Sequence, residues 1–326
     1  MAANSSLASS PYAAATRGSA LLDASSRGRI LFTGPDHLDF LHRMSTNGIA
    51  GSAVGRGLET VFCDSRGRIV QVADLSRTAE EETTAFVEDA PELLAWLERY
   101  RFSERMEWAD ITGATGQIEL LGPAAAEASR SALDAVPEES AATLPPDGLG
   151  LWGMRRRMGG RSTLRLWGPR SGIEECRRLL ATEAAELDAG TWEILRVEWG
   201  LPAAGRELTV DHNPWEAGLG DAVDLDKGCY IGQEVVARLD TYRKVKQHLV
   251  GLCPDREIRS GAQVEAGGRP VGLVTSSVSS PRLGPLALAY VRTPHCRPGT
   301  LLSVDGTAAA VSALPFDPER RDGTGR

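Results

Sequence analysis

The segment 227–234, which reads Lys-Gly-Cys-Tyr-Ile-Gly-Gln-Glu, contains the side chains that could most directly do chemistry. Its two glycines flank a Cys-Tyr pair, and this arrangement indicates that the backbone passes close to another group. If a helix opens at residues 232–234, the thiol of Cys229 lies near its positive end and beside Lys227, and both features favour a thiolate. A small buried side chain fits the same pattern. With no histidine nearby in sequence to act as a base, the residues leave both interpretations of Cys229 open.

A second candidate group lies in residues 191–199, which are predicted to form a helix. Apolar side chains recur there on one face, and Gly200 follows directly as a helix-ending residue. Arg196 and Glu198 fall in the last turn. A carboxylate at this end opposes the helix dipole, so Glu198 requires a cationic partner, such as Arg206, or a ligand. From the residues alone, a paired or solvated glutamate is favoured over a binding residue.

A basic cluster and the scattered cysteines and histidines complete the chemically interesting residues. The cations of the cluster are Arg238, Arg243, Lys244 and Lys246. They could bind a phosphate or a chain of carboxylates, or they could belong to a solvated linker. The five cysteines form no C-x-x-C pair and the five histidines are dispersed, so the spacing predicts no metal site.

These residues must be positioned by elements that recur along the chain. A short apolar strand that ends in Gly-Pro and continues into an amphipathic helix occurs three times, with Gly-Pro at 34–35, 122–123 and 168–169. Residues 61–73 are predicted to form a β-hairpin, and residues 91–100 a helix. Strands and helices that alternate in this way predict an α+β fold with split βαβ (ferredoxin-like) units.

The two ends of the chain have a different composition. After about residue 245, short strands punctuated by Gly and Pro replace the helical periodicity, which predicts a small all-β barrel or sandwich as a separate C-terminal domain. The first 19 residues are rich in Ala and Ser, and residues 317–326 are polar. We therefore predict a disordered tail over 1–19 and a loose tail over 317–326.

The overall composition narrows the class of function. The chain has 326 residues and a net charge of -8, so it is long enough for two or three domains and has no global electrostatic attraction for nucleic acid or anionic membranes. No stretch approaches the apolar length of a membrane span. An odd number of cysteines in a long chain favours a reducing compartment. We predict a cytoplasmic location, without direct nucleic-acid binding and without membrane association.

The segment 227–234 resembles the hallmark K-G-C-Y-x-G-Q-E of the YgfZ family, which is present here in full. The resemblance extends over roughly residues 20–315. The stretches 196–202 and 214–220 also look like the glycine-cleavage T-protein, an aminomethyltransferase. The resemblance implies a T-protein-like fold of three domains in a ring around a folate channel. The implied boundaries are 20–244 for a folate-binding region of two intertwined α+β domains and 245–316 for the barrel.

The resemblance further implies tetrahydrofolate, or a derivative, as the ligand. Glu198 would then accept the adjacent N–H and amino groups of the pterin ring. The residues that the resemblance assigns to folate binding are Arg196, Glu198, Lys227, Gly228, Tyr230, Gln233 and Arg238. It also implies an accessory role in assembling or maintaining iron–sulfur clusters, including those of radical enzymes such as tRNA methylthiotransferases. Cys229 would be the functional residue, with Lys227 tuning it, and the partners would be the iron–sulfur assembly machinery or client iron–sulfur enzymes.

T-protein carries a pair of acidic residues in the strand after its glycine turn, one of them catalytic for methylene transfer. The corresponding stretch here, 69–73, has no carboxylate. Asp74 lies two residues past Val72, the matching position, which is about 7 Å further along the strand. Ordinary aminomethyl transfer is therefore not expected. Two alternatives remain, namely a tetrahydrofolate-dependent aminomethyltransferase or demethylase, and an interaction protein that keeps the fold without the ligand.

Overall fold

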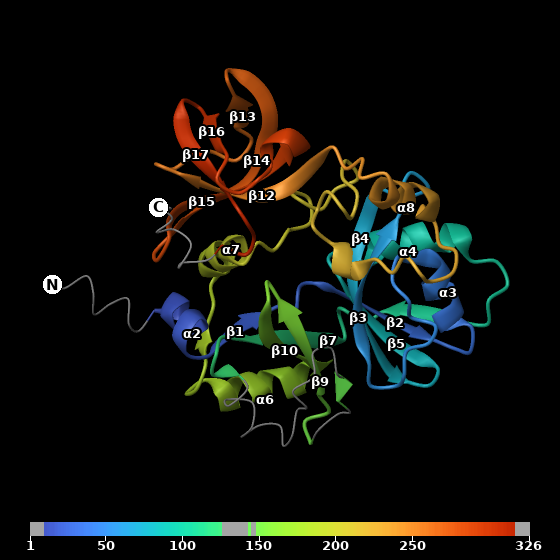
Figure 1. Ribbon diagram of the computed structural model, residues 1–326. Helices are drawn as coiled ribbons and strands as arrows, with labels where there is room; N and C mark the ends of the chain where they lie inside the picture. The colour runs from blue at the N-terminus through green and yellow to red at the C-terminus, as the bar shows by residue number, and fades with distance from the viewer. Residues whose placement is uncertain (1–9, 126–142, 145–147, 317–326) are drawn as a thin grey trace. The chain divides into compact units, whose positions relative to one another are not determined.

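The computed structural model describes residues 10–125, 143–144 and 148–316, which form two compact units (Figure 1). Within these residues, unit 1 comprises the chain up to Arg66, Val70–Thr191 and Asp221–Gln233. Unit 2 comprises Gly67–Ile69, Trp192–Gly220 and the residues from Glu234 onward. Neither unit is a continuous stretch of sequence. The predicted α+β class with a C-terminal β-barrel is confirmed.

Unit 1 contains a five-stranded sheet in the order β3-β4-β5-β2-β6. Its strands are β2 (Gly28–Thr33), β3 (Gly57–Cys63), β4 (Ile69–Ala79), β5 (Glu82–Val87) and β6 (Glu107–Asp110). Helices α3 (His37–Met44) and α4 (Ala90–Leu97), the latter extended by the 3-10 turn η1 (Glu98–Tyr100), share one hydrophobic core with this sheet. The hairpin predicted over 61–73 is the β3–β4 pair, and the helix predicted over 91–100 is α4 with η1.

The second sheet of unit 1 has six strands in the order β11-β1-β7-β10-β9-β8. Its strands are β1 (Ala20–Asp23), β7 (Thr115–Leu121), β8 (Thr143–Leu144), β9 (Trp152–Met158), β10 (Arg161–Pro169) and β11 (Ala185–Glu186). Helix α6 (Arg170–Leu180) lies along this sheet (Figure 1) and buries Ile173, Cys176 and Leu180 against Leu120 and Leu166. The apolar face of the third strand–helix copy therefore builds this core.

The Gly-Pro turns of the repeat have a shared steric cause. Gly34 and Gly122 follow the first two repeat strands with φ of 103° and 102°, a region that L side chains rarely adopt. A Cβ atom would lie 2.5 Å from the Arg105 carbonyl oxygen at the first position and 2.5 Å from the Gly18 carbonyl oxygen at the second. Only glycine fits. Most of the helix predicted after Gly122 lies outside the described residues.

The prediction of a disordered tail over residues 1–19 is wrong for residues 11–17. These residues form helix α2 (Pro11–Arg17), which belongs to unit 1. Ser10 caps this helix by accepting the Ala13 backbone N–H at 3.2 Å, and Pro11 occupies the first turn, where its missing N–H has no consequence. Tyr12, Ala13 and Ala15 are buried. The Ala-rich composition that suggested a tail is therefore packed helix. Residues 1–9 and 317–326 lie outside the described chain.

Unit 2 is built on a closed six-stranded barrel in the order β12-β15-β14-β13-β16-β17. Its strands are β12 (Gln247–Pro254), β13 (Gln263–Ala266), β14 (Arg269–Ser280), β15 (Gly284–Arg292), β16 (Leu301–Val304) and β17 (Thr307–Ser312), with the 3-10 turn η3 (Thr293–His295). The chain enters this unit along α7 (Ala189–Glu198). It returns to unit 1 within η2 (Gly220–Ala222) and enters unit 2 again along α8 (Gln233–Thr241). Alternate strand residues such as Leu252, Val264 and Val304 fill the barrel interior.

Candidate functional site

Lys227 attaches the segment 227–234 to the end of helix α3. The side chain is buried, and its ammonium group donates to the backbone carbonyls of His42, Ser45 and Asn47 at 2.5, 2.6 and 2.9 Å. These oxygens lie at and just beyond the helix C-terminus, where carbonyls lack intrahelical partners. All three ammonium hydrogens are used. Burial lowers the pKa of Lys227 to about 8, with a smaller opposing effect from Asp224.

Cys229 is exposed in this fastened segment. Its neighbour Tyr230 is buried, and the Lys227 ammonium nitrogen lies 5.0 Å from the centre of the Tyr230 ring. The Ile231 backbone N–H donates to the Arg43 carbonyl oxygen at 3.3 Å. The segment is therefore held from both sides of Cys229, and the thiol is presented on a fixed backbone.

A histidine that the sequence did not reveal lies beside this segment. His42 Nε2 would be 3.6 Å from a Cβ atom at Gly228, directly before Cys229. The Ala50 backbone N–H approaches His42 Nδ1 at 3.4 Å, so in the neutral ring the proton sits on Nε2. Burial, and secondly the Lys227 charge, lower the pKa of His42. His42 Nε2 therefore lies beside the backbone at Gly228.

The remaining residues predicted in this part of the chain lie on helix α8. The helix begins at Gln233, within the stretch 232–234 considered as a helix start from the sequence, after Gly232 with φ of 83°. Gln233 Nε2 lies 3.5 Å from the Lys227 carbonyl oxygen, so it closes the segment. Arg238 belongs to unit 2, is exposed and pairs with Glu234 at 3.2 Å. An exposed pair of this kind contributes little to stability.

Arg196 and Glu198 lie in unit 2 at the end of helix α7, and both are buried. The five guanidinium N–H groups of Arg196 match five hydrogen bonds, with Glu193 twice, Glu207, the Leu201 carbonyl oxygen and Ser276. This geometry makes Arg196 a scaffolding residue. Glu198 accepts the Ser280 hydroxyl at 2.5 Å and lies 3.5 Å from Arg282. These contacts supply the compensating partner that a carboxylate at a helix C-terminus requires.

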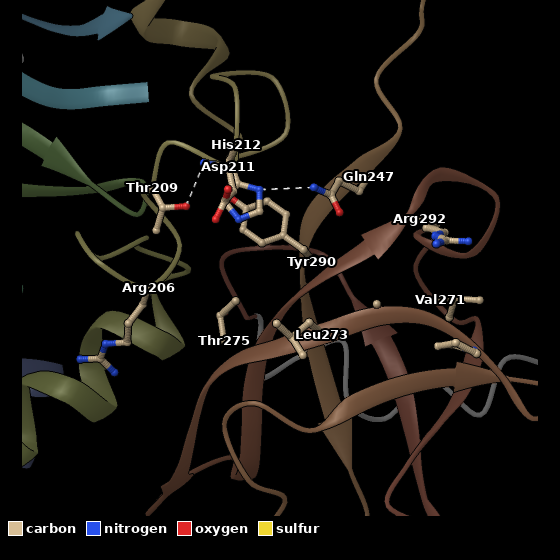
Figure 2. A pocket seen from close by; sticks show the side chains of 12 residues that line it. Arg206, Thr209, Asp211, His212, Gln247, Val271, Leu273, Thr275, Tyr290 and Arg292 are labelled. Atoms are coloured by element: carbon tan, nitrogen blue, oxygen red, sulfur yellow. Dashed lines mark hydrogen bonds between the residues drawn. The ribbon is translucent and has the colours of Figure 1, made fainter. Parts of the chain in front are cut away.

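Unit 2 also contains a cavity of about 380 Å³ between the loop 206–212 and the barrel strands β12, β14 and β15 (Figure 2). The His212 ring stacks on Tyr290 with centroids 3.6 Å apart, and Gln247 contacts His212 Nδ1 at 3.3 Å. Burial lowers the pKa of His212, so the imidazole is neutral at pH 7. Val271 and Leu273 add apolar lining. Arg206, Asp211 and Arg292 add charged groups to the lining, so the cavity combines an aromatic stack with charges of both signs.

A buried ionic cluster joins the two sheets of unit 1. Arg165 on β10 donates from Nε to Glu119 Oε1 at 2.7 Å and lies 3.0 Å from Asp74 Oδ2 on β4. Arg156 on β9 pairs with the same Asp74 oxygen and lies 3.8 Å from Glu119. Arg165 also stacks on Phe86, with the guanidinium carbon 4.3 Å from the ring centre. Arg165 and Glu119 are 2% and 0% exposed at their side chains, so these charges are fully desolvated.

The carboxyl groups of this cluster hold protons more tightly than ordinary carboxyls. Burial raises the pKa of Asp74 and of Glu119, and the nearby arginines oppose that rise. A third carboxyl, Glu59 on β3, is partly exposed. Burial and the negative charge of Asp74 raise its pKa from 4.5 to about 7, against the opposing charge of Arg156. Glu59 therefore exchanges its proton near neutral pH.

This position of the Glu59 pKa predicts a specific pH dependence of stability. Between about pH 4.5 and 7 the folded state binds more protons at Glu59 than the unfolded state, so stability falls as pH rises through that window. Glu59→Gln removes this loss. We expect the variant to be more stable than the native chain by about 1–2 kcal/mol at pH 8, allowing for partial exposure, and equal to it near pH 4.5. Urea unfolding across this range checks the difference, and a difference independent of pH would contradict it.

Within the described residues, no group of three or more His, Cys, Asp or Glu side chains is arranged to hold a metal ion. Over the same residues, no helix has the length and apolar character needed to cross a membrane.

Comparisons with known proteins connect these features to a family. The model for the GCVT N-terminal domain matches residues 5–143, and that for the glycine cleavage T-protein C-terminal barrel domain matches residues 247–317. The aminomethyltransferase of Saccharopolyspora erythraea is 31% identical over 316 residues, which cover 91% of this chain and 86% of that protein. The chain belongs to the glycine cleavage T-protein family.

Further members of the T-protein family agree over nearly the whole chain. A putative chloroplastic transferase of Arabidopsis thaliana, At1g60990, is 29% identical over 92% of this chain and 71% of its own length. The crystal structure of the glycine cleavage system aminomethyltransferase T from Bartonella henselae superposes with a TM-score of 0.86 at 23% identity. That superposition covers 94% of this chain and 89% of the Bartonella chain, and it shows the T-protein fold.

Strand β4 contributes Asp74 to the buried ionic cluster. Val72 and Asp74 are two residues apart in β4 and therefore lie on the same face of the strand. Asp74 is held by two arginines rather than presented alone. Glu59, Glu119, Arg156 and Arg165 were not predicted from the sequence as site residues. The available signal was a charge flanked by apolar residues, as in Ile118-Glu119-Leu120 and Leu164-Arg165-Leu166.

Proposed function

We propose that this T-protein family member is a tetrahydrofolate-binding accessory protein of the YgfZ type, which supports the assembly or maintenance of iron–sulfur clusters. The clients would include radical enzymes such as tRNA methylthiotransferases. The observation that carries the proposal is the exposure of Cys229 on a backbone fastened by Lys227. A thiol that only filled space would be buried, as Cys63 and Cys176 are. The absence of a carboxylate at Val72 supports a function other than ordinary aminomethyl transfer.

Folate recognition in this proposal rests on Glu198. Its carboxylate is buried and positioned by Ser280 and Arg282, so it is preorganised to accept hydrogen bonds. A pterin ring offers an N–H and an amino group side by side, which match one carboxylate. The long contact of 3.5 Å between Arg282 and Glu198 Oε2 is the one that such a ligand would replace. Arg196 would contribute by holding the end of α7 rather than by touching folate.

Calorimetric titration with tetrahydrofolate tests this ligand. We expect saturable binding by the native chain and a loss of at least about tenfold in affinity for Glu198→Gln, since a charge-assisted contact to the pterin is removed. Glu257→Gln, at an exposed glutamate of the same unit, is the matched control and should bind as the native chain does. Absence of binding by the native chain would reject the folate proposal.

The thiol is tested in cells that lack this protein. We expect Cys229→Ala to fold normally, because the side chain is exposed, and to fail to restore the activity of iron–sulfur enzymes. Cys296→Ala is the control and should restore it, because this thiol donates to the Thr293 carbonyl oxygen at 3.1 Å and packs against the barrel core. Full restoration by Cys229→Ala would remove the thiol from the mechanism.

A second candidate is a tetrahydrofolate-dependent aminomethyltransferase or demethylase. It is favoured by the relatives named aminomethyltransferase and by Asp74, which shares a strand face with the T-protein position Val72. Formation of methylenetetrahydrofolate from a glycine-cleavage carrier protein or a methylated amine, lost in Asp74→Asn, would support this candidate over the accessory role.

A further inference from the structure

The cavity of unit 2 has a free hydrogen-bond donor at one end (Figure 2). Gln247 Nε2 donates to His212 Nδ1 at 3.3 Å, so the proton of the neutral imidazole sits on Nε2. Within the described residues, His212 Nε2 has no hydrogen-bond partner, and it is not one of their buried unpartnered atoms. Because His212 lines the cavity, its Nε2–H is open to a ligand there.

An acceptor lies beside this donor. The Asp211 carboxylate is next to the His212 ring, on the side away from Gln247 (Figure 2). It is exposed, and within the described part of the chain it makes no hydrogen bond and no ion pair. Arg68 donates to the backbone oxygen of Asp211 at 2.7 Å, which leaves the carboxylate available. An N–H beside a carboxylate matches a ring edge with an acceptor next to an N–H group, and nucleobases present such edges.

The other end of the cavity carries cations. Arg292 is the last residue of β15, and Figure 2 shows it across the cavity from Asp211. Lys246 is held beside it, because the Thr293 backbone N–H donates to the Lys246 carbonyl oxygen at 2.9 Å. Both cations are exposed, and among the residues that the structure describes neither has an ion-pair partner. Two such cations provide a site for a phosphate group.

The wall between these two ends is apolar and held by the barrel strands. Leu273 of β14 is 48% exposed and lines the cavity together with Val271. The Tyr290 hydroxyl donates to the Glu207 carbonyl oxygen at 2.8 Å, which fixes the ring that stacks on His212. The volume of about 380 Å³ is within the range of about 300–1,000 Å³ that small-molecule sites occupy. The cavity is therefore preformed for a ligand that is polar at both ends.

We propose that this cavity is a binding site for a nucleoside monophosphate. The base lies at the Asp211 end, where it accepts the His212 N–H and donates an adjacent N–H or amino group to the Asp211 carboxylate. The phosphate lies at the other end, on Arg292 and Lys246. One ligand thereby gives a partner to each of the charges that the empty cavity leaves unpaired. Binding is reversible, and no covalent bond changes.

Calorimetric titration of the full chain with AMP tests the proposal. Adenosine and ribose 5-phosphate, titrated at the same ionic strength, represent the two halves of the ligand. We expect saturable binding of AMP and at least about tenfold weaker binding of each half, because each half contacts only one end of the cavity. No binding of AMP would overturn the proposal. Equal binding of AMP and ribose 5-phosphate would also overturn it, because the site would then recognise only an anion.

Two variants at exposed side chains assign the ends of the ligand. Asp211→Ala should weaken AMP and adenosine alike, whereas Arg292→Gln should weaken AMP by about tenfold and leave adenosine unchanged. Arg297→Gln, at an exposed arginine of the same barrel outside the cavity lining, is the matched control and should bind AMP as the native chain does. An equal loss of AMP affinity in Arg297→Gln and Arg292→Gln would reduce the site to a general attraction for anions and contradict the proposal.

A competition experiment separates this site from the proposed folate site. Tetrahydrofolate also combines an amino-bearing ring with an anionic tail, so AMP is titrated in its presence and in its absence. We expect the same AMP affinity in both, because Glu198 does not line the cavity. Competitive displacement of AMP would assign the cavity to folate and overturn the proposal. Binding of AMP by a chain that fails to bind tetrahydrofolate would uphold it and reject the folate proposal alone.

Discussion

Arg165→Met should lower the free energy of unfolding by about 3–5 kcal/mol, the largest effect expected in this chain. The methionine keeps the apolar stem but leaves Glu119, which is 0% exposed, without its closest cation. Asp74 also loses one of its two arginines. Both carboxyls are then either protonated or left as buried charges, and both outcomes lower the stability of the folded state. Urea unfolding at pH 7 measures the loss.

Two further variants separate charge from packing. Glu119→Leu combined with Arg165→Met removes both partners of the closest pair, so it should cost less than Arg165→Met alone. Arg157→Met changes an exposed arginine of neighbouring β9, which only donates to the Gly160 carbonyl oxygen, and should change stability by no more than about 0.5 kcal/mol. If Arg165→Met cost no more than Arg157→Met, the cluster would not hold the two sheets together.

Lys227→Met should have the second largest effect, lowering the free energy of unfolding by about 2–3 kcal/mol. The variant leaves the carbonyl oxygens of His42, Ser45 and Asn47 without their donor. Part of this loss is offset, because the buried ammonium already carries the desolvation penalty that lowers its pKa to about 8. Thermal and urea unfolding measure the stability.

The same variant connects stability to the proposed site. Loss of the Lys227 contacts should free the segment around Cys229, so the backbone amide of Ile231 should exchange its hydrogen faster than in the native chain. Lys244→Met, at an exposed lysine, is the matched control and should leave both stability and exchange unchanged. Unaltered exchange at Ile231 in Lys227→Met would show that other contacts hold the segment.

Elements of the fold were predictable where one residue type meets one backbone requirement. The Gly-Pro turns made the strand–helix repeat predictable, because glycine alone fits a positive φ beside a carbonyl oxygen, as at Gly34 and Gly122. Gly200 marked the end of α7 for a similar reason, with φ of 68°. Helix α2 was not predictable in this way. Its Ala-rich sequence has the composition of a tail, and only tertiary packing of Tyr12 makes it part of the fold.

The candidate site was predictable where its chemistry lies in one continuous segment, and much less so elsewhere. Residues 227–234 stand together in the sequence, whereas the carbonyl partners of Lys227 lie about 180 residues away. His42 escaped notice for the same reason. Glu119 and Arg165 sit in separate copies of the repeat, and only the register of β7 against β10 places them directly opposite each other. Pairing of this kind depends on topology, which local periodicity does not contain.

The closed barrel of unit 2 restricts how another chain could extend this protein's sheets. Each of its six strands has a neighbour on both sides, with β12 pairing to β17 to complete the circle. The barrel therefore has no free strand edge for a partner to join. In the five-stranded sheet, β6 is a four-residue edge that carries Glu107 and Asp110, a charge pattern that discourages further pairing. The other edge strand, β3, is covered in part by residues 45–47, because the Thr46 N–H donates to the Val61 carbonyl oxygen and the Asn47 amide donates to the Glu59 carbonyl oxygen.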